Sequence, residues 1–492
     1  MKNLIEIVAD IKPLEVKGSL DTVISGVYIS SNLIVEGGLF IAIVGEKADG
    51  HNFINEAIEK GARAIVYEKD LIECKDGVTY IKVTDTHEAS GYIASAFYNY
   101  PSKKLKLVGV TGTNGKTTIA TLLHQLFRNL GFKSGMMGTV VNKINDIEVE
   151  ATLTTPDPIT LNQTLATMAD AGCEYCFMEV SSRAISIKRI AGSQFAGGIF
   201  TNLTHDHLDF HNTMEEYAKV KQEFFTNLPS SCFALSNLDS EYGEYMLEST
   251  KAKKYFYSRE AHSTSSGQHF QFTGNVETKL IGDFNQSNVL AILGTAVLLG
   301  IDDKVAREEI KKLDPAPGRF VSFTSPTGVT GIVDYAHTPD ALENVLKTIQ
   351  NLRPADVGRL QEQTSDVCKI ITVVGCGGDR DKAKRPIMAK IAYDLSDILI
   401  MTSDNPRTEK VEDILNDMQK GLPDLAQGLS LRQKVYVISD RHLAIQKACE
   451  LAKSGDYILL AGKGHENYQE VNGAKTHFDD MEELKNCFKK MV

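Results

Sequence analysis

The stretch "GVTGTNGKTT", residues 109–118, constrains the fold of this chain more than any other part of its sequence. It follows the apolar "LKLV" and precedes "IATLLHQLFRNL", whose apolar residues recur at helical spacing: Ile119, Leu122, Leu123, Leu126 and Phe127. A strand, a glycine-rich turn and a helix start in that order form a phosphate site, because exposed backbone N–H groups and the helix dipole favour an anion there. Lys116 would reach the outer phosphates, and the Thr117 hydroxyl would ligate Mg²⁺.

The loop departs by one residue from the pattern G-x-x-x-x-G-K-[ST], because Val110 stands where the first glycine belongs. The alternative is a glycine turn with an exposed lysine, but "GKTT" between a strand and an amphipathic helix favours phosphate binding. The residues that we expect around the phosphates are Gly112, Thr113, Asn114, Gly115, Lys116, Thr117 and Thr118.

Alternating strands and helices extend from the loop in both directions and predict an α/β protein of three domains. At roughly 150 residues per domain, the 492 residues are enough for three. We expect a small α/β domain at 1–102, a central parallel-sheet ATPase domain at 103–317 and a Rossmann-like domain at 318–492, after the linker "DPAPGR". The polar stretch 353–367 is interpreted as a surface insertion.

Composition restricts the class of partner. The formal charge of -11 argues against broad nucleic-acid binding. The chain has no apolar run of about 18 residues and no signal peptide, so a cytoplasmic location is expected. We expect its partners to be small molecules and the chain to be a monomer.

Polar residues follow two strands of the central domain, in "MEVSS" and "NLTHDHLDFH". The carboxyl ends of strands in an open α/β sheet form the ligand crevice, so Glu179 and His207 can converge on the metal of the loop. The alternative for the histidines at 205, 207 and 211 is that this segment simply caps the next helix. That helix, "EEYAKVKQEFF", carries Lys219 and Lys221.

From about residue 25 to 470 the chain closely resembles the Mur ligase family, the ATP-dependent amide-forming enzymes of peptidoglycan precursor synthesis. The motifs that carry the resemblance are "TGTNGKTT", "TTPD", "EVSS", "NLTHDHLDFH", "YAKVK", "GDFNQSNVLA", "PGRF", "DYAHTPDAL", "GCGGDRDKAKRP", "SDNPRTE" and "GKGHENYQ". The last three resemble the members that add the third residue of the stem peptide.

The resemblance implies a reaction in which ATP phosphorylates the D-glutamate carboxylate of UDP-MurNAc-L-Ala-D-Glu. The amine of a diamino acid then displaces phosphate from the acyl phosphate. Lys116 and Mg²⁺ at Thr117 and Glu179 would offset the charge of the approaching anions. By resemblance, Lys221 is carbamylated by CO₂ and, with Glu179 and His207, binds a second Mg²⁺; the alternative is a solvated helix lysine.

The resemblance also implies substrate contacts in all three domains. Ser31, Thr154, Thr155, Ser181 and Arg189 match positions that hold the UDP-MurNAc-dipeptide, although the common Asp-Ser-Arg is here Ser30, Ser31 and Asn32, and Arg183 replaces a usual histidine. Further matches to the ATP site, which imply closure of the third domain onto the second, are Asn285, Asn288, Arg319, Asp334 and His337. Helix capping is the alternative for the two asparagines.

Arg407 in "SDNPRTE" is the residue that indicates which amino acid is added. A guanidinium can bind a carboxylate through two parallel hydrogen bonds, as a bidentate pair. meso-Diaminopimelate carries a distal carboxylate that L-lysine lacks. Glu466 would pair with the distal ammonium. The matching positions are Arg380, Asp404, Asn405, Pro406, Arg407, Gly462 and Glu466.

Three other functions remain open at this point. The same ligase could add L-lysine, or the chain could be a ligase resembling folylpolyglutamate synthetase, which shares the three-domain plan. A P-loop switch or motor is the third, although such a protein has no need for the cluster of Arg380, Arg407 and Glu466.

Overall fold

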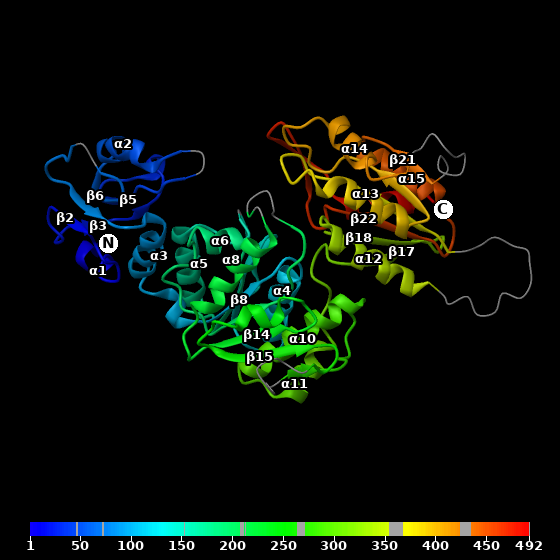
Figure 1. Cartoon of the computed structure of the whole chain (residues 1–492), viewed down its shortest axis with the longest axis horizontal. Coiled ribbons are helices and arrows are strands. Elements are labelled where there is room, and N and C mark those ends of the chain that lie inside the picture. Colours follow the sequence, from blue (N-terminus) through cyan, green and yellow to red (C-terminus); the bar gives the residue numbers. More distant parts are fainter. Residues whose placement is uncertain are drawn as a thin grey trace, which may run out of the picture.

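Three main β-sheets follow one another along the chain in the computed structural model (Figure 1). The structure describes residues 1–45, 48–70, 73–151, 153–206, 211, 213–262, 271–353, 368–423 and 434–491. The predicted insertion therefore lies outside the described residues except for its first one. The predicted α/β class with largely parallel sheets is confirmed. Within the described ranges, no helix has the length and apolarity needed to cross a membrane.

The N-terminal sheet has the order β2-β7-β6-β5-β4, with β2 antiparallel to its neighbour and the other strands parallel. Successive side chains of β5 pack on opposite faces, Leu39 on the side of α3 and Phe40 on the side of α2. The elements are β1 Lys2–Asn3, α1 Leu4–Ile7, β2 Glu15–Lys17, β3 Val23–Ile24, β4 Val27–Tyr28, β5 Gly38–Ile41, α2 Ile54–Glu59, β6 Ala62–Tyr67, β7 Thr79–Lys82 and α3 Thr86–Phe97.

The central sheet has the order β11-β10-β9-β12-β8-β13-β14-β15-β16, in which β10 and β11 form an antiparallel hairpin at one edge. β8 lies between β12 and β13, so the loop after it emerges where the strand order reverses. The elements are β8 Lys106–Thr111, α4 Lys116–Asn129, β9 Ser134–Met137, β10 Val141–Ile144, β11 Ile147–Glu150, α5 Pro158–Asp170, β12 Tyr175–Glu179, α6 Ser182–Ser186, β13 Gly197–Phe200, α8 Met214–Thr226, β14 Phe233–Asn237, α9 Gly243–Leu247, β15 Lys253–Ser258, β16 Gln271–Thr273, α10 Asp283–Leu298 and α11 Asp303–Ile310.

Both faces of the central sheet are covered, which explains the continuous apolar runs of its strands. Val108 of β8 packs with residues of α4 and α10, and its neighbour Leu107 packs on the other face with residues of α5 and α8. The helix predicted after the loop is α4, and its apolar residues at helical spacing are buried.

The C-terminal sheet has the order β17-β18-β22-β19-β20-β21, parallel except for β17. The carboxyl ends of β18, β22, β19 and β20 lie next to one another, and the motifs of this domain follow those ends. The elements are β17 Val321–Thr324, β18 Thr330–Asp334, α12 Pro339–Leu352, β19 Ile370–Val374, α13 Lys384–Leu395, β20 Ile398–Met401, α14 Val411–Gln419, β21 Val435–Val437, α15 Arg441–Leu451, β22 Tyr457–Ala461, β23 Tyr468–Val471, β24 Ala474–His477 and α16 Asp480–Lys490.

Helix α3 joins the first sheet to the central domain. The Lys188 ammonium of the central domain lies 3.0 Å from a carboxylate oxygen of Asp85 and 2.6 Å from one of Glu88. A Cβ atom at Gly91 of α3 would lie 2.3 Å from the carbonyl oxygen of Ala191. Glycine at this position therefore permits a close approach between the helix and the 188–192 loop.

Candidate active site

The phosphate loop runs from the end of β8 to the start of α4, as predicted. Gly112 and Gly115 have φ angles of 148° and 88°, conformations that side chains rarely adopt. A Cβ atom at Gly112 would lie 1.8 Å from Thr201 Oγ1, and one at Gly115 would lie 2.6 Å from Asn288 Oδ1. The loop therefore needs glycine at both positions because two polar side chains approach its backbone.

Two lysines converge behind the loop. The ammonium of Lys116 donates to the carbonyl oxygens of Gly112 at 2.9 Å and Thr113 at 2.7 Å. The ammonium of Lys221, from α8, donates to the same Gly112 oxygen at 3.0 Å and to Thr111 Oγ1 at 3.4 Å. Lys221 is 1% exposed, so it is not the solvated helix lysine of the alternative interpretation, whereas Lys219 is exposed.

Burial lowers the pKa of both lysines. For Lys221 the pKa is well below its usual value, because the amine is desolvated and the positive charge of Lys116 is nearby. For Lys116 burial is again the main cause of the lowered pKa, and the carboxylates of Glu179 and Asp206 oppose it. A neutral Lys221 amine has the chemistry that reaction with CO₂ needs.

The Glu179 carboxylate lies at the end of β12, beside the first turn of α4. Its Oε1 accepts from Thr117 Oγ1 at 3.0 Å and from the Thr139 amide at 2.8 Å, and Thr139 Oγ1 donates to Oε2 at 3.2 Å. A hydroxyl and a carboxylate are the hard oxygen ligands that Mg²⁺ prefers, and Mg²⁺ completes its shell with phosphate oxygens and water. This pair therefore fits the predicted metal.

The histidine-rich segment is only partly described. His207, the predicted ligand, lies outside the described residues. His205 Nε2 lies 3.4 Å from Asp381 Oδ2 of the C-terminal domain, and His211 Nε2 lies 2.8 Å from Ser182 Oγ. Within the described ranges, no group of three or more His, Cys, Asp or Glu side chains could hold a metal ion.

The C-terminal domain reaches the phosphate loop through Arg319. Its Nη2 donates to Thr117 Oγ1 at 3.0 Å, and its guanidinium carbon lies 4.7 Å from the centre of the Tyr335 ring. A further contact between these domains, from Asn114 Nδ2 to Asp340 Oδ2 at 2.7 Å, was not anticipated from the sequence. Asp340 belongs to the motif "DYAHTPDAL", but nothing in its spacing indicated which domain its side chain would contact.

Asp334 is buried and His337 is half-buried, and both lie near enough to Arg319 to feel its charge. Burial raises the pKa of Asp334 to about 6, against the opposing effect of the Arg319 charge. Asp334 Oδ2 accepts from the Phe320 amide at 2.7 Å. Burial lowers the pKa of His337 to about 4, and its Nδ1 lies 2.8 Å from the Tyr335 carbonyl oxygen. His337 is therefore neutral at pH 7.

Asn285 and Asn288 lie in the first turns of α10. The cap residue of this helix is Gly282, which makes no side-chain cap bond, and Asn285 Nδ2 instead donates to the Ile281 carbonyl oxygen at 2.8 Å. Asn288 Nδ2 donates to Asn285 Oδ1 at 3.1 Å. Neither asparagine is thus the cap of the alternative interpretation. A cavity of about 320 Å³ is lined by Asn285 together with Lys279, Pro315, Arg319 and Phe320, among others.

The four predicted dipeptide contacts of the central domain lie together next to Glu179. Thr155 Oγ1 donates to the Glu179 carbonyl oxygen at 2.8 Å and accepts from the Ser181 amide at 3.1 Å. Arg189 Nη1 donates to the Thr155 carbonyl oxygen at 2.8 Å, and Thr154 Oγ1 accepts from Thr139 Oγ1 at 3.0 Å. Ser31 lies apart from these residues in sequence, in a 3₁₀ turn of the N-terminal domain over Ser31–Leu33.

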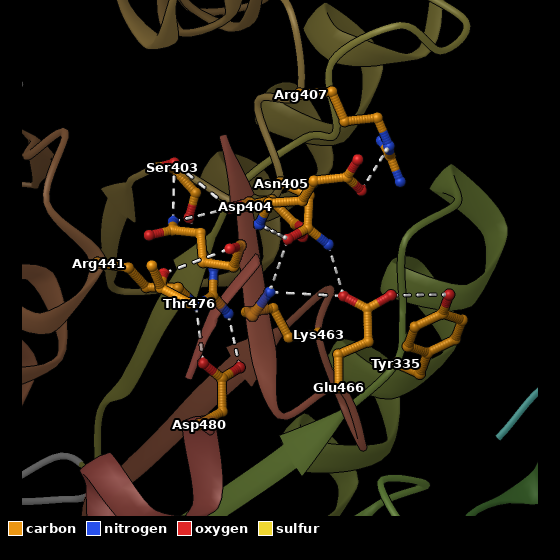
Figure 2. A network of polar contacts seen from close by, with 12 residues as sticks. Tyr335, Ser403, Asp404, Asn405, Arg407, Arg441, Lys463, Glu466, Thr476 and Asp480 are labelled. Atoms are coloured by element: carbon orange, nitrogen blue, oxygen red, sulfur yellow. Dashed lines mark hydrogen bonds and ion pairs between the residues drawn. The ribbon is translucent and has the colours of Figure 1, made fainter. Parts of the chain in front are cut away.

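In the C-terminal domain, Glu466, which is predicted to bind the added amino acid, contacts three polar side chains (Figure 2). Asn405 Nδ2 donates to Glu466 Oε2 at 2.7 Å, and the buried Lys463 ammonium lies 3.4 Å from the same oxygen. Tyr335 donates its hydroxyl to Glu466 Oε1 at 3.4 Å. Burial and the nearby Asp404 carboxylate raise the pKa of Glu466. Lys463 and Tyr335 were missed as site residues, although both stand inside the quoted motifs.

Arg407 lies beside this group, held on two sides. Its Nη1 donates to the Gly378 carbonyl oxygen at 2.8 Å, and its Nε lies 3.6 Å from Glu470 Oε2. Its φ angle of 52° is in the left-handed region, which is uncommon for arginine. Arg380 is exposed, and its Nη1 donates to the Asp379 carbonyl oxygen at 3.1 Å. Gly462 has a φ angle of 112°, and a Cβ atom there would lie 2.6 Å from Asp404 Oδ2.

A buried ion pair supports the loops that carry these residues. The Arg441 guanidinium donates from Nε and Nη2 to the two carboxylate oxygens of Asp480, each at 2.7 Å (Figure 2). It also donates to the carbonyl oxygens of Ser403 at 3.3 Å and Ala461 at 3.1 Å. Ser403 precedes Asp404 and Ala461 precedes Gly462, so one guanidinium touches both loops.

Comparisons with known proteins match each of the three domains. Residues 23–98 match the model described as "Mur ligase family, catalytic domain", residues 110–296 the Mur ligase middle domain and residues 318–464 the Mur ligase glutamate ligase domain. A UDP-N-acetylmuramoyl-L-alanyl-D-glutamate--2,6-diaminopimelate ligase of Bacteroides fragilis is 50% identical, with 98% of each chain covered. The ligase of that name from Clostridioides difficile is 39% identical, with 99% of each chain covered.

Solved structures agree with this result. A structure titled as that same ligase is 30% identical and has a TM-score of 0.65, with 99% of each chain covered. A folylpolyglutamate synthase of Mycobacterium tuberculosis, complexed with ADP and AMPPCP, is 15% identical with a TM-score of 0.57; 76% of this chain and 92% of that chain are covered, a likeness of fold alone. From its family models and its full-length relatives, the chain belongs to the Mur ligase family.

Proposed function

We propose that the chain joins meso-diaminopimelate to UDP-MurNAc-L-Ala-D-Glu in an ATP-dependent reaction that releases ADP and phosphate, in cytoplasmic peptidoglycan precursor synthesis. The observation that carries the proposal is the 50% identity, over 98% of both chains, to a ligase named for that substrate and 2,6-diaminopimelate. The L-lysine, folylpolyglutamate-synthetase-like and switch alternatives find no comparable support.

In the first step the D-glutamate carboxylate attacks the terminal phosphorus of ATP, and ADP leaves. Lys116 and Arg319, whose side chains both lie at the loop, would bring positive charge to the phosphates, and the first backbone amides of α4 would donate to phosphate oxygens. Bound Mg²⁺ supplies charge neutralisation at the transferred phosphoryl group. Thr117, Glu179, His207 and a carbamylated Lys221 are the residues that we assign to two such ions.

In the second step the amine of diaminopimelate attacks the acyl phosphate, and phosphate leaves. Glu466 and Asn405 would hold the distal ammonium, since a half-buried carboxylate with an amide beside it suits an ammonium donor. Arg407 would hold the distal carboxylate. Asp404, Gly462 and Arg380 complete this site, and Pro406 turns the loop. The dipeptide would lie along Thr154, Thr155, Ser181 and Arg189, with Ser31 at the uridine end.

The proposal is tested by phosphate release with ATP, Mg²⁺ and UDP-MurNAc-L-Ala-D-Glu, with meso-diaminopimelate, L-lysine or no amine added. A UDP-tripeptide identified by mass only with meso-diaminopimelate is the expected result. Preference for L-lysine would overturn the amino-acid assignment, and amine-independent hydrolysis would overturn the ligase. After incubation with ¹³C-bicarbonate, a carbamate signal in the ¹³C NMR spectrum that is absent from Lys221→Met would support the carbamate on Lys221. Gel filtration with light scattering tests the proposed monomer.

A further inference from the structure

Two loops of the C-terminal domain, which follow the neighbouring strands β19 and β20, are joined along their length. The Gly378 amide donates to the Asn405 carbonyl oxygen at 2.9 Å, and Arg407 Nη1 donates to the Gly378 carbonyl oxygen at 2.8 Å. A Cβ atom at Gly378 would lie 1.9 Å from the Pro406 carbonyl oxygen. Arg407 therefore takes its position from the 377–380 loop as well as from its own.

Asp379 of the first loop and Thr408 of the second are also joined by hydrogen bonds. Thr408 Oγ1 lies 2.8 Å from Asp379 Oδ1 and 2.9 Å from Oδ2, and the Thr408 amide donates to Oδ2 at 3.2 Å. These bonds lower the pKa of Asp379, which stays ionised at neutral pH. Asp379 has a φ angle of 53°, a left-handed conformation that persists in a non-glycine residue when its surroundings hold it.

The buried guanidinium of Arg385 holds Glu409, the residue that follows Thr408. Arg385 is fully buried and donates to the two carboxylate oxygens of Glu409, from Nη1 at 3.1 Å and from Nη2 at 2.8 Å. Glu409 Oε1 also accepts from the Asp379 amide at 2.6 Å, and Asp417 Oδ2 accepts from Arg385 Nη1 at 3.0 Å. Glu409 thus links the second loop to the backbone of the first and to helix α13.

We propose that Asp379, Thr408, Glu409 and Arg385 form a clasp that positions Arg407 and thereby determines the preference for an amino acid with a distal carboxylate. The proposal rests on the proposed function. The four are positioning residues, since the substrate contact is assigned to Arg407. The physical reason is that Arg407 and Asp379 both hold left-handed backbone conformations, which relax when the contacts around them are lost.

Thr408→Val is the decisive variant, because valine keeps the shape of threonine and removes the hydroxyl that donates to Asp379. Thr408 is exposed, so the change leaves the core intact. Thr408→Ser restores the hydroxyl. Thr167→Val is the matched control, since Thr167 is also exposed and its hydroxyl donates only to a carbonyl oxygen of its own helix, that of Gln163.

The measurement is the KM for meso-diaminopimelate, for ATP and for the UDP-dipeptide, together with the ratio of kcat/KM for meso-diaminopimelate over L-lysine. In Thr408→Val we expect the KM for meso-diaminopimelate to rise and the ratio to fall, each by about tenfold, the effect of one lost hydrogen bond to a charged group. The other KM values stay unchanged, and Thr408→Ser and Thr167→Val resemble the wild type. An equal rise in every KM, or no change, would overturn the clasp.

Hydrogen exchange of the chain without substrates gives a second readout. Thr408→Val should speed exchange of the amides of Gly378, Asp379 and Arg407, and Thr408→Ser should not. The Asp379 amide donates to Glu409 of the clasp, and the other two donate to the carbonyl oxygens of Asn405 and Glu470, so they report whether the two loops stay in place. Unchanged exchange would overturn the clasp whatever the kinetics. A wild type that uses no diamino acid would overturn the proposed function, and the exchange experiment would then still decide whether the clasp holds the loop.

Discussion

Asp334 carries a titratable group whose pKa affects the stability of the fold. Its pKa is raised from 3.8 to about 6 by burial, so the folded state binds a proton more tightly than the unfolded state. Its contribution to stability is present below pH 3.8 and is lost as the pH rises through 6.

The difference in the free energy of unfolding between the wild type and Asp334→Asn should therefore depend on pH. A shift of this size corresponds to about 3 kcal/mol. The free energy of unfolding of the wild type, relative to the variant, should therefore fall by most of that amount, about 2.5 kcal/mol, between pH 4 and pH 7.5. Urea unfolding at several pH values measures it. A difference that is constant with pH would contradict the prediction.

Glu179 is the carboxylate that brings negative charge next to Thr117. Glu179→Gln keeps acceptors for Thr117 and Thr139 but removes the charge that, on the proposed function, would attract Mg²⁺. We expect the Mg²⁺ concentration for half-maximal turnover to rise by about tenfold to a hundredfold, in line with changes at metal sites. The matched control is Glu174→Gln, an exposed residue just before the same strand. An unchanged Mg²⁺ titration would remove Glu179 from the metal site.

Helices α15 and α16 are joined beneath the amino-acid site by the pair Arg441–Asp480, both fully buried. Asp480→Asn would remove the carboxylate that is paired with the buried guanidinium, which costs about 3–5 kcal/mol in the free energy of unfolding. Equilibrium urea unfolding at pH 7 measures this loss.

The control for that prediction is Asp394→Asn on α13, which breaks an exposed pair with Lys390. We expect this change to cost less than about 1 kcal/mol. Equal losses in the two variants would show that burial does not set the strength of the Arg441–Asp480 pair.

Local patterns in the sequence were sufficient to predict the helices, strands and loops, but not the long-range ion pairs and hydrogen bonds that hold the loops in place. The strand, loop and helix around Lys116 were predictable because apolar spacing and glycines report on adjacent residues. The clasp and the Arg441–Asp480 pair join residues 24 to 39 positions apart, and no periodicity links such residues. For the same reason the burial of Lys221 could be inferred only from the family resemblance, since α8 also carries the exposed Lys219.

The close contact of Gly91 with Ala191 sets how the N-terminal domain meets the rest of the molecule. Gly91→Ala would place a Cβ atom 2.3 Å from a backbone oxygen, so the helix must move. The 188–192 loop carries Arg189, and we therefore expect the KM for the UDP-dipeptide to rise by about tenfold or more. The KM for ATP should stay unchanged, and small-angle scattering would record the altered domain arrangement. A proportional change in both KM values would contradict this.

Tyr335 connects the region around Glu466 with Arg319. Its ring lies against the Arg319 guanidinium, and its hydroxyl donates to Glu466. Arg319 in turn contacts Thr117 of the phosphate loop. A change at Glu466 that adapted the enzyme to another amino acid would therefore also disturb its handling of ATP. Arg407 has its own support and lies outside this chain of contacts. New amino-acid preferences should consequently arise in the Arg407 loop first, and an engineer seeking them would begin there.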